Sequence, residues 1–231
     1  MFSLESIAED AVRIELNNCN ENDTPQIIAR LKHAIEQHIP NAVSDYLPAY
    51  NTLTLITRFP RVLPQDLIHD IRTKILGSLL TDNLFTPART LYIPAFYDHA
   101  TGPDLERVAH YNNTDIQNVI TQHSTQTFQV YAIGFSPGFA YLGYLPNNLT
   151  CPRLDKPRPF VAKGSLGIAG RQTGVYPKDS PGGWNIIGRS PFVFFKPNEE
   201  KAEHICPLSI GDGVQFQAVS QREFIRLGGQ L

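Results

Sequence analysis

The segment from residue 134 to residue 191 constrains the fold most strongly, because glycine or proline interrupts it every few positions. It holds 10 of the 16 glycines and 8 of the 18 prolines in a chain of 231 residues. Helical periodicity ends at Thr127, and short apolar runs such as FQVYAIG and PFVFF alternate with turn residues. Such runs are typical of strands in a β-barrel or sandwich. We therefore expect a mainly-β domain over residues 89–231.

The first 88 residues follow a different pattern, in which short strands alternate with amphipathic helices. Residues 11–16 and 52–58 alternate apolar and polar side chains, as half-buried strands do, and residues 43–47 offer a further strand. Apolar stripes predict one helix after Pro25 and a second helix after Pro64. The order strand, helix, strand, strand, helix predicts an α+β N-terminal domain, residues 1–88, of the ferredoxin-like split βαβ kind. Residues 81–87 have the turn chemistry of a linker.

Between these regions the sequence predicts one strand and two short helices. The apolar run at residues 91–97 fits the sheet of either domain. A helix begins within residues 102–106, and Thr114 and Asp115 cap a second helix that runs to about His123. Because a cation at a helix end interacts favourably with the dipole, His123 has a capping or surface role in one interpretation. In the other it is a general acid or base.

Charge and composition exclude several classes of protein. The formal charge of −2 argues against a protein that binds nucleic acid or an anionic membrane by electrostatic attraction. The first ten residues lack the basic and apolar regions of a signal peptide, and no apolar stretch approaches the ~20 residues of a membrane span. Three distant cysteines and scattered histidines match neither a disulfide framework nor a metal site. We expect a cytoplasmic protein with no metal, nucleic-acid or membrane partner.

Charge is distributed unevenly along the chain. Residues 134–191 carry seven basic and two acidic side chains, a balance of +5, whereas the remaining residues have a balance of −7. Gly164, Gly167, Gly170 and Gly174 are candidates for loops that present N–H groups to an anion. The asymmetry favours an anion-binding cleft. The alternative is a tightly wound barrel with glycines at its corners and solvated charges outside.

Of two short motifs, one is present without the chemistry that it usually carries, and the other is absent. Residues 134–138 match the G-x-S-x-G pattern of a nucleophile elbow. The residue after that serine normally donates its N–H to the oxyanion, but Pro137 has none, which argues against a serine hydrolase. The chain also lacks a G-x-x-x-x-G-K-[ST] phosphate loop. Any nucleotide must therefore be held in another way.

Several long motifs resemble one known family. They are Gly134–Pro146, the pairs Pro152-Arg153 and Pro157-Arg158, and Gly164–Pro191, with further similarity at Gly102–Ala109 and Gly211-Asp212. Together they resemble the family of the 5-oxoprolinase B subunit, also called allophanate hydrolase subunit 1 or the Kip-inhibitor (KipI) family. The resemblance covers about residues 90–218.

The resemblance implies a small α+β domain followed by a cyclophilin-like barrel of the carboxyltransferase subdomain C/D type. It implies one component of an ATP-dependent 5-oxoprolinase, which opens 5-oxoproline to glutamate together with an A subunit and with a C subunit of related barrel fold. ATP then enters at the level of the complex, and the isolated chain is inactive. The family also permits an inhibitor of a sensor histidine kinase, or a component of an allophanate or urea-amide hydrolase or carboxylase. A prolyl isomerase rests on barrel analogy alone.

Under this resemblance, the positive segment supplies every site residue except His123. A carboxylate and a lactam carbonyl call for forked donors and neutral hydrogen-bonding groups. We expect substrate binding by arginine clamps, lactam-orienting side chains and backbone N–H groups, at Arg153, Arg158, Gly167, Gly170, Gln172, Thr173 and Tyr176. The catalytic candidates are His123, Lys163 and Arg171. Lys163 stands in the sequence VAKGSL, where relatives commonly read VPAGSV, so it adds a charge beside the expected pocket.

Overall fold

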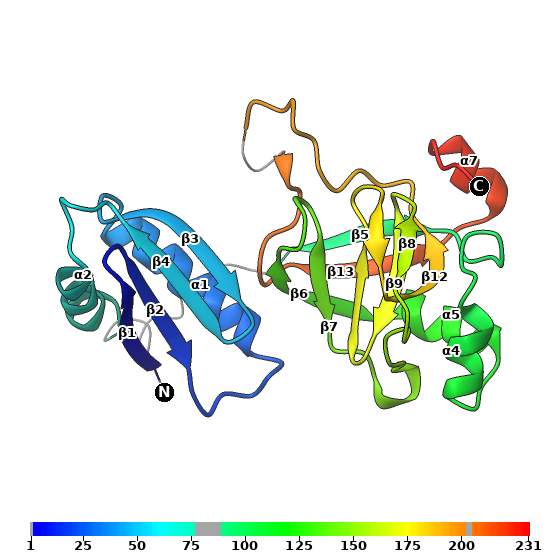
Figure 1. Cartoon of the computed structure of the whole chain (residues 1–231), viewed down its shortest axis with the longest axis horizontal. Coiled ribbons are helices and arrows are strands. Elements are labelled where there is room, and N and C mark those ends of the chain that lie inside the picture. The colour runs from blue at the N-terminus through cyan, green and yellow to red at the C-terminus, as the bar shows by residue number, and fades with distance from the viewer. Residues whose placement is uncertain (1, 77–88, 202–204) are drawn as a thin grey trace. The chain divides into compact units, whose positions relative to one another are not determined.

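The structure is a computed structural model that describes residues 2–76, 89–201 and 205–231 (Figure 1). The chain divides into two compact units, residues 1–88 and residues 89–231. The linker expected at residues 81–87 lies outside the described residues. Both units are built around antiparallel sheet, with few helices.

The first unit is a four-stranded antiparallel sheet packed against helices. Its strand order is β1-β2-β4-β3. The strands and helices are β1 (Phe2–Ala8), β2 (Ala11–Leu16), α1 (Thr24–His38), β3 (Val43–Ala49), β4 (Thr52–Thr57) and α2 (Pro64–Asp70). A π-helical turn, Ile71–Ile75, extends α2. The strands predicted at 11–16, 43–47 and 52–58 and both helices are confirmed, whereas β1 is an additional strand that pairs with β2.

Alternating side chains bury one face of this sheet. Ile14 of β2 lies opposite Leu53 of β4, and both are fully buried. Helix α1 covers them with the buried residues Ile28, Leu31 and Ile35, which form the apolar stripe predicted after Pro25. Because a helix has 3.6 residues per turn, residues three or four positions apart share the face that packs on the apolar side of the sheet.

The second unit is a ring of strands in the order β5-β13-β6-β7-β10-β9-β12 (Figure 1). Beyond β5, Phe96 and Arg189 exchange two backbone hydrogen bonds of 2.8 Å, which joins the last strand to the first. The pair β5 and β13 is parallel and the other pairs are antiparallel. The strands are β5 (Thr90–Ala95), β6 (Thr127–Ile133), β7 (Ala140–Gly143), β9 (Ser165–Ala169), β10 (Gln172–Val175), β12 (Asn185–Arg189) and β13 (Gly213–Ala218).

Shorter elements surround the ring. They are α4 (Leu105–Tyr111), α5 (Ile116–Thr125), a 3₁₀ turn at Asn147–Leu149, the two-stranded ribbon of β8 (Arg158–Val161) and β11 (Ser180–Gly182), and α7 (Gln221–Arg226). Asp115 caps α5 as predicted, because its carboxylate accepts the N–H of Asn118 at 2.7 Å. The strand predicted at 91–97 belongs to the second unit as β5.

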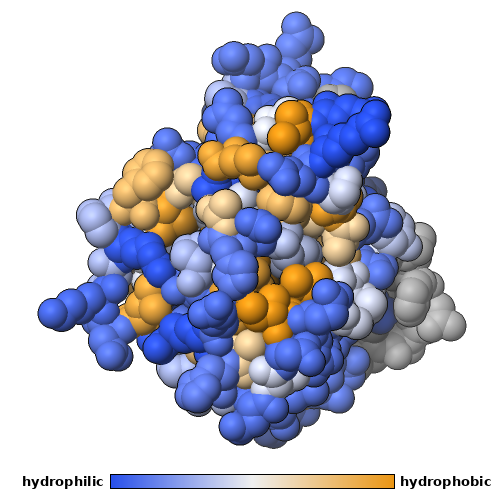
Figure 2. Space-filling view, turned by 90° about the vertical axis from the view of Figure 1, so that its right-hand side faces the viewer, coloured by the Kyte–Doolittle hydropathy of each residue, from blue (hydrophilic) through white to orange (hydrophobic). Residues whose placement is uncertain are grey.

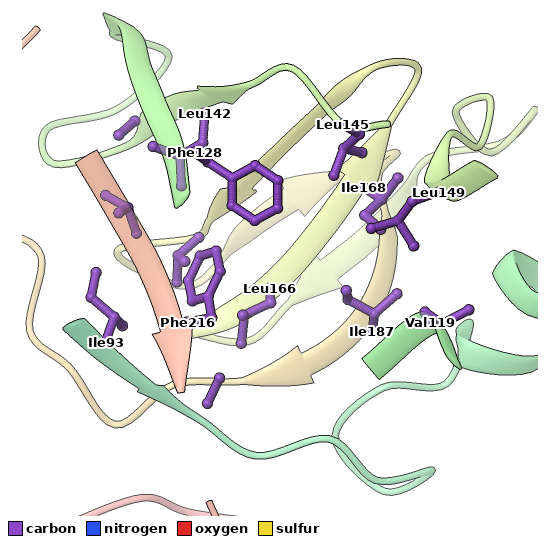
Figure 3. Packing of buried hydrophobic residues seen from close by; sticks show 14 of the residues in the cluster. Ile93, Val119, Phe128, Leu142, Leu145, Leu149, Leu166, Ile168, Ile187 and Phe216 are labelled. Carbon is purple, nitrogen blue, oxygen red and sulfur yellow. The ribbon is translucent and has the colours of Figure 1, made fainter. Parts of the chain in front are cut away.

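An apolar core fills the inside of the ring (Figure 3). Phe128 and Phe216 point inward from neighbouring strands, while Leu166 and Ile168 project from β9. Val119 of α5 reaches the same core. Alternate residues of β9 and β10 face the other way, so the ring has a second set of side chains on its outer surface.

The face that carries α4, α5 and α7 shows apolar residues separated by hydrophilic ones (Figure 2). Tyr111 of α4 and Ile225 of α7 are exposed large hydrophobic residues of these elements. Within the described residues, no helix has the length and apolar character needed to cross a bilayer.

Candidate functional site

An aromatic cluster lies on the outer face of the ring, above a pair of glycines. Its rings are those of Phe135, Phe139, Tyr176 and Trp184. Gly167 of β9 and Gly174 of β10 face each other across the ladder. A Cβ atom at Gly167 would lie 3.0 Å from the Cβ of Trp184, and one at Gly174 would lie 3.2 Å from Phe139 Cζ. At Gly174 a Cβ would also lie 2.8 Å from the Ala140 carbonyl oxygen, closer than real Cβ atoms come, so this position requires glycine. At Gly167 the contact is tight, and glycine lets the rings pack directly on the backbone.

The rings of this cluster meet edge to face. Phe139 lies between Tyr176 and Trp184, with ring centroids 5.5 and 5.4 Å apart. Phe135 stands at the rim, 62% exposed, and contacts Phe139 and Tyr176. Its φ of +68° is unusual for a side chain of this size, and such backbone geometry concentrates at functional sites.

Two of the predicted arginines border this cluster. The exposed Arg153 places its guanidinium carbon 5.8 Å from the Trp184 ring. Arg158 donates through Nη2 to Asp104 Oδ1 at 2.7 Å, and the other Asp104 oxygen accepts the N–H of Ile186 at 2.7 Å. This fixes Arg158 to the start of α4 and to β12. Its Nη1 atom is buried and has no hydrogen-bond partner.

The Tyr176 phenol is the neutral polar group of the candidate site. Burial raises the pKa of Tyr176, and the positive charges of Arg153 and Arg158 oppose this shift. The phenol therefore remains protonated near neutral pH and is available as a hydrogen-bond donor. Arg153, Arg158 and Tyr176 are all expected to bind substrate, and the charges of both arginines act on the Tyr176 phenol. Two cations and one neutral donor are groups that suit an anion site.

Two other predicted residues lie inside the ring. His123 is completely buried, with Nδ1 2.7 Å from the Tyr97 hydroxyl and Nε2 2.7 Å from Thr173 Oγ1. Burial lowers the pKa of His123 to about 3, so the ring is neutral. The surface position considered for this histidine is wrong, because α5 turns it toward the core between Phe128 and Phe216.

Comparison with known proteins identifies the family. Residues 2–205 match the carboxyltransferase domain, subdomain C and D. The chain belongs to this family. It is 32% identical to the 5-oxoprolinase B subunit of Bacillus subtilis (strain 168), over 96% of this chain and 95% of the relative. It is 37% identical to the 5-oxoprolinase B subunit of Escherichia coli O157:H7, over 94% of this chain and 95% of that relative. The resemblance found in the sequence is thereby confirmed.

Two solved structures have a similar fold. The crystal structure of TTHA0988 is 30% identical with a TM-score of 0.75, and the match covers 91% of this chain but 40% of that one. The urea carboxylase of Kluyveromyces lactis, at 16% identity, has a TM-score of 0.70 over 97% of this chain and 22% of its own. The carboxyltransferase fold therefore persists where the sequence has diverged.

The remaining predicted residues of this family member lie in the turns at the two ends of β9. Arg171 and Gly170 form the turn between β9 and β10, with the Arg171 guanidinium carbon 4.3 Å from the centroid of the Tyr144 ring. Gln172 follows that turn at the start of β10. Lys163 is exposed in the turn before β9, where its backbone N–H donates to Asp179 Oδ1 at 2.7 Å.

The glycine-rich run has a different structure from the loop considered in the sequence. Gly167 lies inside β9, which pairs with β10 on one side and β12 on the other. Gly164 and Gly170 have positive φ and do lie in turns. Gly167 and Gly174 therefore provide a flat surface for aromatic rings, because their missing side chains leave room for them.

Sequence reasoning missed Trp184 and Asp104 as members of the site. Both stand inside the motifs that carry the family resemblance, in GGWNIIG and GPDLERVA. Asp104 precedes α4 and sits 54 positions from its partner Arg158. No local pattern connects residues at this separation, so their position in the motifs was the available signal.

Proposed function

We propose that this protein is the B subunit of an ATP-dependent 5-oxoprolinase, which opens 5-oxoproline to L-glutamate together with the A and C subunits. The observation that carries the proposal is the full-length relationship to two proteins named as the B subunit of 5-oxoprolinase. In this assignment the chain acts in the cytoplasm within a hetero-oligomer and has no turnover alone.

The same proposal assigns a domain to each unit. Residues 1–88 form a ferredoxin-like domain in which β1 takes the edge position that completes the sheet. Residues 89–231 form a cyclophilin-like barrel of the carboxyltransferase subdomain C/D type. The ring closure between Phe96 and Arg189 supports a barrel rather than an open sheet.

The substrate carboxylate binds at the two arginines beside the aromatic cluster. Arg153 offers an exposed guanidinium, and the buried Nη1 of Arg158 has no hydrogen-bond partner among the described residues. A carboxylate accepts forked hydrogen bonds from such groups and neutralises the positive charge that Asp104 leaves unmatched. The protonated Tyr176 phenol then donates to the lactam carbonyl. Lys163 and Arg171 are exposed and remain catalytic candidates within the assembled enzyme.

ATP is the second substrate of the proposed reaction. The chain lacks a G-x-x-x-x-G-K-[ST] loop, and we assign none of its residues to the nucleotide. Among the residues that the structure describes, no group of three or more His, Cys, Asp or Glu side chains is arranged to hold a metal ion.

Reconstitution tests the proposal. The chain is co-expressed with its A and C partners, and ATP-dependent glutamate release from 5-oxoproline is measured with and without it. We expect release that disappears when the chain is omitted. A folded three-part complex without activity would contradict the proposal and shift attention to binding of a sensor kinase.

Substitution of the arginines tests their assigned roles in the same assay. Arg153→Ala removes an exposed side chain and should raise KM for 5-oxoproline about tenfold or more, since hydrogen bonds to charged groups contribute about 1.5–3 kcal/mol. Arg158→Lys keeps the charge beside Asp104 while removing the fork, and should also raise KM. Arg226→Ala, at an exposed arginine of α7, is the matched control. Unchanged KM in the two site variants would refute the clamp.

A further inference from the structure

A buried chain of polar side chains inside the barrel has no role in the function proposed above. It runs from Tyr97 through His123 to Thr173 and ends on the carbonyl oxygen of Gly167. His123 and Thr173 are completely buried. Polar groups in such a place are costly unless each is hydrogen-bonded, so this chain requires an explanation.

The direction of the chain follows from its last acceptor. The Gly167 carbonyl can only accept, so the Thr173 hydroxyl, 3.0 Å away, donates its single proton there. His123 Nε2 must then carry the proton that it donates to Thr173 Oγ1. A neutral imidazole has one N–H, so Nδ1 is the acceptor and the Tyr97 hydroxyl donates to it. Each link then has one donor and one acceptor, and both ring nitrogens of His123 are satisfied.

The surroundings hold His123 in this single tautomer. Its ring stacks on Phe216 with centroids 4.7 Å apart and lies 5.4 Å from Phe128. Apolar neighbours leave the ring nitrogens dependent on Tyr97 and Thr173. In a low-dielectric interior such hydrogen bonds are strong and a broken link is expensive.

The chain ends directly beneath the candidate site. The carbonyl that it fixes belongs to Gly167, whose outer side faces Trp184 and Tyr176. A Cβ at this glycine would lie 3.0 Å from Trp184 Cβ and 3.5 Å from Tyr176 Cε2, so the two rings rest on its backbone. A tilt of the Gly167 peptide would therefore displace both rings.

We propose that Tyr97, His123 and Thr173 are positioning residues, which fix the Gly167 peptide from inside the barrel and thereby hold Trp184 and Tyr176 in the candidate site. The site's assignment to 5-oxoproline rests on the proposed function, but the mechanical coupling does not. The alternative is that the chain only contributes to stability.

Fluorescence separates these two roles, because Trp184 is the one tryptophan in the sequence. The full-length protein is compared with Thr173→Val, which has nearly the same shape without the hydroxyl, and Thr173→Ser, which retains it. Val175→Ala is the matched control, since Val175 lies two residues along β10, is buried in the core and is outside the chain. Emission and acrylamide quenching are recorded well below the unfolding temperature of each variant.

We expect Thr173→Val to shift the Trp184 emission to longer wavelength and to increase its quenching, and Thr173→Ser to restore wild-type values. Val175→Ala should lower the unfolding midpoint without changing either signal. An unchanged Trp184 signal in Thr173→Val, or the same change in Val175→Ala, would overturn the proposal. If Thr173→Val does not fold, Tyr97→Phe removes a single hydroxyl from the far end of the chain and is tested in the same way.

Nitrogen NMR of the His123 ring provides a second test that needs no substitution. The proposal requires a neutral ring protonated on Nε2 at pH 7. Observation of the Nδ1–H tautomer would overturn the direction of the chain. Both measurements use the isolated protein, so they remain decisive even if the reconstituted complex does not open 5-oxoproline. If the complex does open 5-oxoproline, Thr173→Val should raise KM for 5-oxoproline and Thr173→Ser should not.

Discussion

At the scale of single residues, the buried His123 should make stability depend on pH. Burial lowers its pKa to about 3, whereas the same side chain titrates near 6.5 in the unfolded chain. Between these values the unfolded state binds more protons, so stability falls as the pH decreases from 6.5 toward 3. The contribution of His123 to this slope approaches about 1.4 kcal/mol of unfolding free energy per pH unit. Urea unfolding at several pH values measures it.

A matched pair of substitutions isolates this contribution. His123→Gln removes the buried titrating group and should flatten the decline of stability between pH 6.5 and 4. His110→Gln makes the same change at an exposed histidine of α4 and should retain the wild-type slope. Equal slopes in all three proteins would show that His123 is not buried in a neutral form.

Gly167 leaves little room even for a methyl group. The Cβ of Gly167→Ala would lie 3.0 Å from Trp184 Cβ, so Trp184 must move by a few tenths of an ångström. Overpacking of this kind costs about 1–3 kcal/mol, which corresponds to a decrease in melting temperature of several degrees. Gly134→Ala places its Cβ where no atom lies within 4 Å and is the control. A melting temperature equal to that of the control would mean that the rings do not rest on this backbone.

The sequence was informative about which residue types form the site but not about their arrangement. The charge asymmetry and the family motifs pointed to Arg153 and Tyr176, which contact rings of the aromatic cluster, and to Arg158, whose charge acts on the Tyr176 phenol. His123 and Thr173 were also selected, yet both point into the core. The inward or outward direction of a strand residue depends on register, and a shift of one position reverses it. Register is set by pairing with distant strands, which a single sequence does not display.

At the scale of elements, α7 packs on the seam of the ring, although it lies beyond the residues 2–205 that match the family. Phe224 is completely buried and stacks on Phe96, the residue that bonds to Arg189 across the seam. Phe224→Ala should destabilise the protein by about 3 kcal/mol or more, measured by denaturant unfolding. Ile225→Ala, at an exposed neighbour in the same helix, should have little effect. Equal stability of the two variants would contradict a sealing role.

Elements with a local signal were predicted well, and those defined by long-range pairing were not. Helices α1 and α5 were found from apolar spacing and from the Asp115 cap. Strand β13 lies parallel to β5, more than 100 residues earlier, and nothing local to either strand indicates this pairing. β1 was missed because it is mostly exposed and has a weak apolar pattern. Pairing with β2 stabilises it instead.

At the scale of the whole molecule, each unit has an apolar core of its own. The ring of the second unit uses strands from Thr90 to Ala218 and needs none from the first unit to close. Arg89 stands at its beginning and binds the Asp212 carboxylate through Nε, at 3.1 Å to each oxygen. Since the ring closes without the first unit, the predicted division at residue 88 can be tested directly. The test is to express the second unit alone.

We expect residues 89–231 to fold without the first unit, since a chain of this length can bury a sufficient core. Trp184 reports on this unit alone, so the fragment should reproduce the Trp184 emission maximum of the full chain and melt cooperatively. A fragment that begins at residue 97 lacks β5 and Phe96, which leaves β13 unpaired on one side and the seam open. It should show the emission of a solvent-exposed tryptophan. If the longer fragment behaves in the same way, the barrel depends on the first unit and the two domains are not independent.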